Sequence, residues 1–191
     1  MRLSVVSLKW RAAAAAVACA AALTPAAALA ASGAPAAPVA RAGAAAPVPA
    51  CATSGLVIWL TSNGVAAGTA FYTLNFTNLS GHACTLVGHP GVAALSLAGH
   101  QVGAPAGWEP PAAHVVRLAN RATGYALIRY SDVIAGGGGP KPCDAVISAG
   151  LRVFPPGQTA AKQVPLPLPA CTRPHVVYMN VAPVQKTPPV N

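Results

Sequence analysis

Four cysteines between residues 51 and 191 are of a type that can form disulfides, bind a metal or act as nucleophiles. They are Cys51, Cys84, Cys143 and Cys171, and no two have the Cys-x-x-Cys spacing of a redox motif or structural zinc site. Their even number favours two disulfides, which persist in an oxidising compartment. Of the three possible connectivities we favour the sequential one, Cys51 with Cys84 and Cys143 with Cys171, and the two crossed pairings stay open.

The carboxylates that general acid–base catalysis requires are scarce. Only Glu109, Asp132 and Asp144 are present, and we expect each in a loop or at the end of a strand. Hydrolysis of glycosides usually needs two carboxylates about 5 to 10 Å apart, and nothing in these spacings indicates such a pair. The chain also lacks the Gly-x-Ser-x-Gly turn of many serine hydrolases. We therefore predict no catalytic residues and a protein that is not an enzyme.

Histidine, the commonest metal ligand, occurs five times. No two of the five have His-x-His or His-x-x-x-His spacing, so we expect them in exposed loops. One pair flanks Cys84 and is the candidate for a copper or zinc site, but this is the less favoured interpretation. We predict no metal site and no cofactor. The pair is His82 and His89, and the others are His100, His114 and His175.

The elements that must position these residues have the pattern of short strands bounded by Gly, Pro or Asn. Thr69–Asn78 alternates in hydrophobicity, which places Leu74 and Phe76 on one face, whereas Gly55–Leu60 is a continuous apolar run typical of a fully buried strand. The aromatic side chains of these strands, Trp59 included, are expected in the core. The other predicted strands are Val92–Leu97, Val115–Leu118, Gly124–Tyr130, Val146–Phe154, Ala160–Leu166 and Val176–Ala182.

Seven or eight short strands without a sustained 3.6-residue period predict an all-β domain. We expect a two-sheet antiparallel sandwich, immunoglobulin-like or a related Greek key, stapled by two disulfides. About 140 residues are enough for one such domain with a single core.

The first 50 residues have the composition of an export leader followed by a linker. Three basic residues in the first eleven, an alanine-rich apolar run and an Ala-Leu-Ala site ending at residue 30 predict a secretory signal peptide. The run is shorter than the roughly 20 residues that span a bilayer, so we expect no transmembrane span in the mature chain. Cys19 lies in this run, which makes a lipoprotein the less favoured alternative to a secreted protein. The predicted divisions are a signal peptide at 1–30, a disordered Ala/Pro-rich spacer at 31–50, the sandwich domain at 51–185 and a short tail at 186–191.

Charge is sparse in the part of the chain after the linker. Residues 51 to 191 carry eight basic and three acidic side chains, a net charge of +5, so charged residues make up about 8% of them against roughly 25% in typical soluble domains. The basic residues are scattered singly, whereas nucleic-acid binding needs them clustered. We therefore exclude nucleic acid as a partner and expect a monomer with a neutral, polar surface.

The stretch from Phe76 to Gly91, FTNLSGHACTLVGHPG, has a strand ending in Thr-Asn, a Ser-Gly turn, Cys-Thr-Leu and then Gly-x-Pro-Gly. It resembles the exported actinobacterial domain-of-unknown-function family 4232 (DUF4232). The resemblance covers roughly residues 51 to 184 and implies an all-β domain, secreted or lipid-anchored, behind an Ala/Pro/Ser-rich spacer. It implies no activity. Weaker matching pieces are Cys51, Gly68, Pro142-Cys143, Phe154–Ala160 and Ala170-Cys171.

The scarcity of catalytic groups favours a non-catalytic cell-envelope or extracellular binding module. Its partner would be an envelope protein, a wall polymer or a glycolipid, held by a sparsely charged sheet face or a loop end. The alternatives are a metal-binding sandwich that uses His82 and His89, and a protease inhibitor that presents the loop Pro140–Asp144. A hydrolase that pairs Glu109 with Asp132 or Asp144 is less favoured still.

Overall fold

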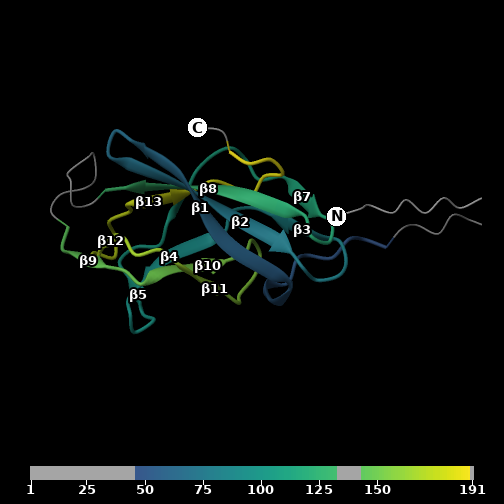
Figure 1. The fold of residues 1–191 in the computed structure, drawn as a ribbon, viewed down its shortest axis with the longest axis horizontal. Helices are drawn as coiled ribbons and strands as arrows, with labels where there is room; N and C mark the ends of the chain where they lie inside the picture. The colour runs from purple at the N-terminus through teal and green to yellow at the C-terminus, as the bar shows by residue number, and fades with distance from the viewer. Residues whose placement is uncertain (1–45, 133–142, 190–191) are drawn as a thin grey trace, which may run out of the picture. The chain divides into compact units, whose positions relative to one another are not determined.

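The computed structural model describes residues 46–132 and 143–189 (Figure 1). Regular structure within these ranges consists of strands and one 3-10 turn, Thr53–Gly55, and it includes no α-helix. The fold is therefore all-β, as predicted. The strands are β1 (Leu56–Ala66), β2 (Thr69–Asn78), β3 (Cys84–Val87), β4 (Gly91–Leu95), β5 (Gln101–Val102), β6 (Gly107–Trp108), β7 (Val115–Leu118), β8 (Thr123–Ser131), β9 (Ala145–Ile147), β10 (Gly150–Phe154), β11 (Lys162–Pro165), β12 (Pro169–Cys171) and β13 (Met179–Val181).

The largest sheet has the strand order β1-β2-β8-β13-β6. Its strands pair antiparallel except β6, which runs parallel to β13. The β1–β2 hairpin turns at Gly68, whose φ of 77° suits glycine, and a register shift between Ser62 and Gly64 marks a β-bulge. A second sheet has the order β11-β10-β4-β5, and two further pairs are β12–β9 and β3–β7.

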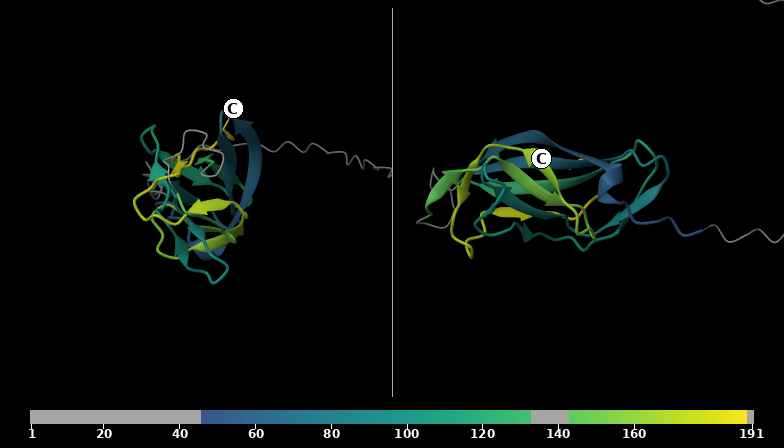
Figure 2. Two further views of the ribbon diagram at one scale, coloured as in Figure 1. Left: turned by 90° about the vertical axis from the view of Figure 1, so that its left-hand side faces the viewer. Right: turned by 90° about the horizontal axis from the view of Figure 1, so that it is seen from below.

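The two larger sheets lie face to face (Figure 2). Their apolar side chains form one buried core cluster. Leu74 and Phe76 of β2 are fully buried on one face, as the alternation predicts. Ile128 of β8 and Leu151 and Val153 of β10 complete this layer, also with no exposed surface. The arrangement confirms a sandwich of two packed sheets.

Strand β1 differs from its prediction. It lies at the edge of the five-stranded sheet, and Val57 and Trp59 are 46% and 47% exposed. The predictions that Gly55–Leu60 is fully buried and that Trp59 packs in the core are therefore wrong. Leu56 and Ile58 face the core, and Val57 and Trp59, which face outward, are apolar as well, so the run is continuous.

Two other predictions about strands need correction. The segment Val146–Phe154 is not one strand, because β9 and β10 are separated at Ser148, whose hydroxyl donates to the Leu166 carbonyl at 3.3 Å. Strand β3 was also missed, since its four residues lie in a stretch interpreted as a corner. The short strands β5, β6 and β12 were not predicted either.

Both disulfides have the sequential pairing that was favoured. Cys51 pairs with Cys84 and Cys143 with Cys171, with Cα atoms 4.8 and 5.4 Å apart. The first disulfide is reinforced by backbone bonds to Thr85, whose carbonyl accepts from the Cys51 N–H at 2.9 Å. It fixes the start of the domain to β3. The second fixes β12 to the residues just before β9.

Candidate functional site

Two of the three carboxylates form ion pairs with arginines. Glu109 forms an ion pair with Arg129, with its Oε2 3.3 Å from Nε, and Oδ2 of Asp144 lies 3.9 Å from Nη2 of Arg173. Asp132 follows β8, and its backbone N–H donates to Gly68. Over residues 46–132 and 143–189, no three side chains of His, Cys, Asp or Glu gather closely enough to hold a metal ion.

His82 and His89 make different contacts. The His89 ring stacks on Trp108, with centroids 5.2 Å apart and planes at 10°, and its Nε2 lies 2.7 Å from the Glu109 carbonyl. His82 is exposed, and its backbone carbonyl accepts from the side chain of Asn78 at 2.8 Å. In the candidate protease-inhibitor loop Pro140–Asp144, residues 140–142 lie outside the described residues. The predicted signal peptide, with Cys19, also lies outside them.

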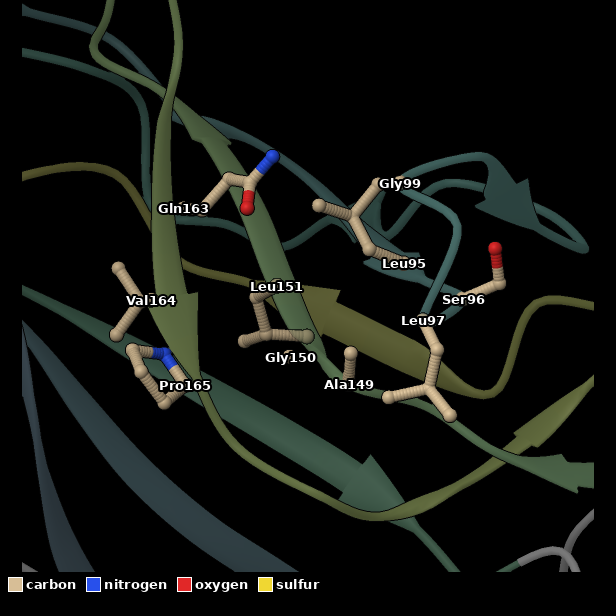
Figure 3. Close-up of a pocket in the computed structure, with 10 residues that line it drawn as sticks. All are labelled: Leu95, Ser96, Leu97, Gly99, Ala149, Gly150, Leu151, Gln163, Val164 and Pro165. Carbon is tan, nitrogen blue, oxygen red and sulfur yellow. The ribbon is translucent and has the colours of Figure 1, made fainter.

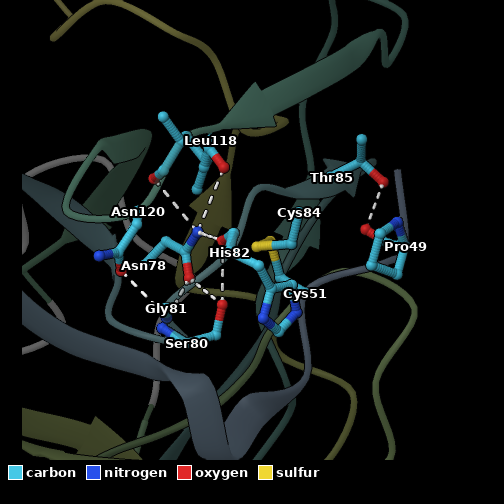
Figure 4. The surroundings of a disulfide bond; sticks show 11 residues. Pro49, Cys51, Asn78, Ser80, Gly81, His82, Cys84, Thr85, Leu118 and Asn120 are labelled. Carbon is cyan, nitrogen blue, oxygen red and sulfur yellow. Dashed lines mark hydrogen bonds between the residues drawn. A yellow bond between two sulfur atoms is a disulfide. The ribbon is translucent and has the colours of Figure 1, made fainter. Parts of the chain in front are cut away.

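The corner around Cys84 is built on Asn78 (Figure 4). Its amide nitrogen is within 3.2 Å of the carbonyls of His82, Leu118 and Ala119, and its Oδ1 accepts from the N–H and hydroxyl of Ser80 at 3.0 and 2.7 Å. Since Asn78 is fully buried, both ends of its amide are occupied by the protein. Asn78 therefore has a structural role at this corner, and its amide is not available to a ligand.

A pocket of about 320 Å³ lies at the end of the second sheet (Figure 3). Leu95, Leu151 and Val164 line it, and the polar side chains are those of Ser96 and Gln163. Because no charged side chain lines it, the pocket has no group that would anchor an ionic ligand or promote a reaction.

The candidate functional surface is the outer face of the β1-β2-β8 layer, which is turned away from the core. Strand pairing places its side chains in rungs, and opposite residues on antiparallel strands share a face. We call this surface the outer sheet face. It consists of Val57, Trp59 and Thr61 on β1, of Phe71, Thr73, Asn75 and Thr77 on β2, and of Thr123, Tyr125, Leu127 and Arg129 on β8.

Neutral hydrogen bonds join the strands across this face. Trp59 donates from Nε1 to the Thr77 hydroxyl at 3.3 Å, and that hydroxyl lies 3.0 Å from the hydroxyl of Thr123. The Asn75 amide donates to the Thr61 hydroxyl at 3.1 Å and lies within 3.3 Å of two backbone carbonyls. Buried polar side chains are thus satisfied, and the side chains they hold have little freedom left to lose on binding.

An ion pair lies at one end of the outer sheet face. Arg129 bonds Glu109 through Nε, and its guanidinium carbon lies 5.8 Å from the centre of the Phe71 ring. Two shallow pockets of about 480 and 320 Å³ lie beside it, and both are lined by Leu127 and Arg129. The first is bounded by the bulge of β1, from Asn63 to Ala66, and the second by prolines, Pro110 among them.

Sequence reasoning missed this surface because it assigned Trp59 to the core. The signal was present in Thr69–Asn78, where Thr73, Asn75 and Thr77 alternate with the apolar residues and so share the opposite face. Only the pairing of β1 with β2 shows that Trp59 joins them. The face combines aromatic rings, hydroxyls and amides, and Arg129 is the one charged side chain among its named residues.

Comparison with known proteins identifies a family but no activity. The family model described as "Domain of unknown function (DUF4232)" matches residues 51–185. No curated protein and no solved structure matches the chain. Among the described residues, no helix has the length and apolar character needed to cross a membrane.

Proposed function

Since the chain belongs to the DUF4232 family, whose description assigns no activity, we propose from its own residues that it is a secreted, non-catalytic binding module. Its outer sheet face holds a ligand of the cell envelope or the extracellular medium. The observation that carries this proposal is Trp59, an indole 47% exposed on the outer sheet face, where neutral hydrogen-bonding side chains surround it. A large aromatic side chain left open on a rigid sheet is typical of binding surfaces.

Secretion is supported by two independent features. The first 30 residues have the charge and composition of an export signal, and the two disulfides fit an oxidising compartment. The absence of a catalytic role is supported by Glu109 and Asp144, since each is held in an ion pair with a different arginine rather than with another acid.

The experiment is retention of the purified, oxidised protein on the insoluble envelope fraction of its own cells, at low salt and at about 0.5 M salt. The Debye length at 0.5 M is about 4 Å, so exposed charge pairs are largely screened. Binding through the neutral outer sheet face should therefore persist, whereas capture through the net charge of +5 would be lost.

A matched pair of variants tests which surface is used. Trp59→Ala should lower retention about tenfold, because it removes the exposed ring from the outer sheet face. Trp108→Ala is the control: its indole is 71% exposed but stacks on His89, outside this face. Equal retention of both variants and the wild type would show that the outer sheet face is not the binding surface.

A further inference from the structure

The outer sheet face has a second aromatic ring on the rung of Trp59. Trp59 pairs with Asn75, and Asn75 pairs with Tyr125 on the far side of β2. Two strand spacings separate the two aromatic residues, about 10 Å. A backbone bridge places Gln185 opposite Tyr125, so one rung across the sheet reads Trp, Asn, Tyr, Gln. The rung thus alternates aromatic rings with amides.

The indole of Trp59 lies over the sheet. It reaches Thr77, the diagonal neighbour on β2, and the 3.3 Å bond from Nε1 holds it there. About half of the side chain, 47%, remains exposed to solvent. A ring fixed in this way is a platform for a flat apolar surface and loses little freedom on binding.

Free hydrogen-bonding groups lie beside the two rings. Within the described part of the chain, the Tyr125 hydroxyl and the Gln185 amide have no hydrogen-bond partner. The Thr61 hydroxyl accepts from Asn75 and keeps its own proton for donation. The rung therefore offers both donors and acceptors to a ligand, whereas Asn75 in its centre is occupied and serves to hold the surface rigid.

The charge on the outer sheet face gives no preference for a charged ligand. Arg129 is its one charged side chain, and it lies two rungs from Tyr125 with its charge countered by Glu109 at 3.3 Å. The rings of Trp59 and Tyr125 are separated by the buried Asn75 and flanked by hydroxyls of Thr61, Thr77 and Thr123, so they do not form one continuous apolar centre of the kind typical of tight protein interfaces. A ligand with apolar C–H faces, many hydroxyls and no charge matches the surface better.

We propose that the ligand of the outer sheet face is an uncharged polysaccharide segment that crosses the strands along this rung. Its sugar rings stack on Trp59 and Tyr125, and its hydroxyls bond Thr61, Tyr125 and Gln185. The inference rests on the proposed function and names the chemical class of the ligand.

The test uses polysaccharide extracted from the same envelope fraction and freed of protein by protease digestion. This polysaccharide should compete with the envelope for the wild-type protein. After periodate oxidation, which cleaves the vicinal diols of sugars, and quenching of the reagent, the same material should no longer compete. Failure of the untreated, protein-free polysaccharide to compete would overturn the glycan assignment and point to a protein ligand.

Variants separate stacking from folding. Direct binding of the wild type to the protein-free polysaccharide should weaken about tenfold in Trp59→Ala, whereas Trp59→Phe, which keeps an aromatic ring, should stay within about threefold. Tyr125→Ala should weaken binding by a similar factor, and Trp108→Ala should bind like the wild type. Equal binding by Trp59→Ala and the wild type would overturn the stacking mode.

The two proposals fail in different ways. If retention on the envelope depends on Trp59 but the polysaccharide does not compete, the surface is right and the ligand class is wrong. If retention is independent of Trp59, the outer sheet face is not the binding surface, and if retention is absent, the proposed function itself fails.

Discussion

Tyr130 and Tyr178 pack edge to face in the core, with ring centroids 6.0 Å apart and planes at 87°. Their hydroxyls differ. Tyr130 donates to the carbonyl of Pro169 at 2.7 Å, whereas the buried hydroxyl of Tyr178 has no hydrogen-bond partner among the described residues. The pair therefore contains one satisfied and one unsatisfied buried hydroxyl within a single aromatic contact.

Removing the two hydroxyls should have opposite consequences for stability. Tyr130→Phe should lower the free energy of unfolding by about 1 kcal/mol, because it breaks a hydrogen bond and leaves the Pro169 carbonyl unpaired. Tyr178→Phe should leave it unchanged or raise it by up to about 1 kcal/mol, since no bond is lost. Denaturant midpoints of both variants check this, and a destabilised Tyr178→Phe would show that the hydroxyl has a partner.

The same hydroxyl should make the protein sensitive to alkali. Burial, together with the nearby Tyr130, raises the pKa of Tyr178 above its usual value near 10. A pKa that is higher in the folded protein means that the unfolded chain releases this proton first. The resulting stabilisation is present below pH 10 and is lost as the pH rises above it. Melting temperatures between pH 9 and 12 should therefore fall less steeply for Tyr178→Phe than for the wild type, and parallel curves would contradict this.

Asn78 should be the more sensitive of two asparagines at the Cys84 corner. Asn78→Ala removes a buried amide that serves three carbonyls and should lower the free energy of unfolding by about 2 to 3 kcal/mol. Asn120→Ala is the matched control. Asn120 is exposed and accepts one bond, from the Gly81 N–H at 3.1 Å, so its loss should cost less than about 1 kcal/mol. Similar losses in the two variants would contradict the structural role of the corner.

Single replacement of the acidic residues should leave binding nearly intact. Glu109→Gln, Asp132→Asn and Asp144→Asn each remove a charge that lies outside the rung of Trp59. Retention on the envelope fraction should stay within about twofold of the wild type, since exposed ion pairs contribute little. A loss of a hundredfold or more in any biological activity of one variant would instead indicate general acid or base catalysis.

More of the fold than of the candidate site could be predicted from the sequence. The alternation in Thr69–Asn78 predicted the core face of β2 correctly, because a strand with one buried face repeats every two residues. The same rule fails for β1, where Val57 and Trp59 are apolar on the exposed side and hide the alternation. A continuous apolar run cannot distinguish a buried strand from an edge strand with an apolar binding surface.

The position of the site also depends on register, which local sequence does not encode. Trp59 and Tyr125 are far apart in the chain and share a rung only through their common neighbour Asn75. The disulfide pairing could be favoured from the sequence because each sequential pair closes a short loop. The strand pairs that contain disulfide cysteines, β3 with β7 and β12 with β9, could not be predicted.

The bulge between Ser62 and Gly64 has a consequence for how the chain behaves at high concentration. A long strand at the edge of a sheet exposes a row of unpaired backbone groups on which another molecule can add a strand, the first step toward aggregates. In β1 the bulge interrupts the regular row, and Gly64, with a φ of 106°, bends the strand away from the flat geometry that such stacking needs. The hairpin can thus keep an aromatic face open to a ligand while limiting self-association through its own edge.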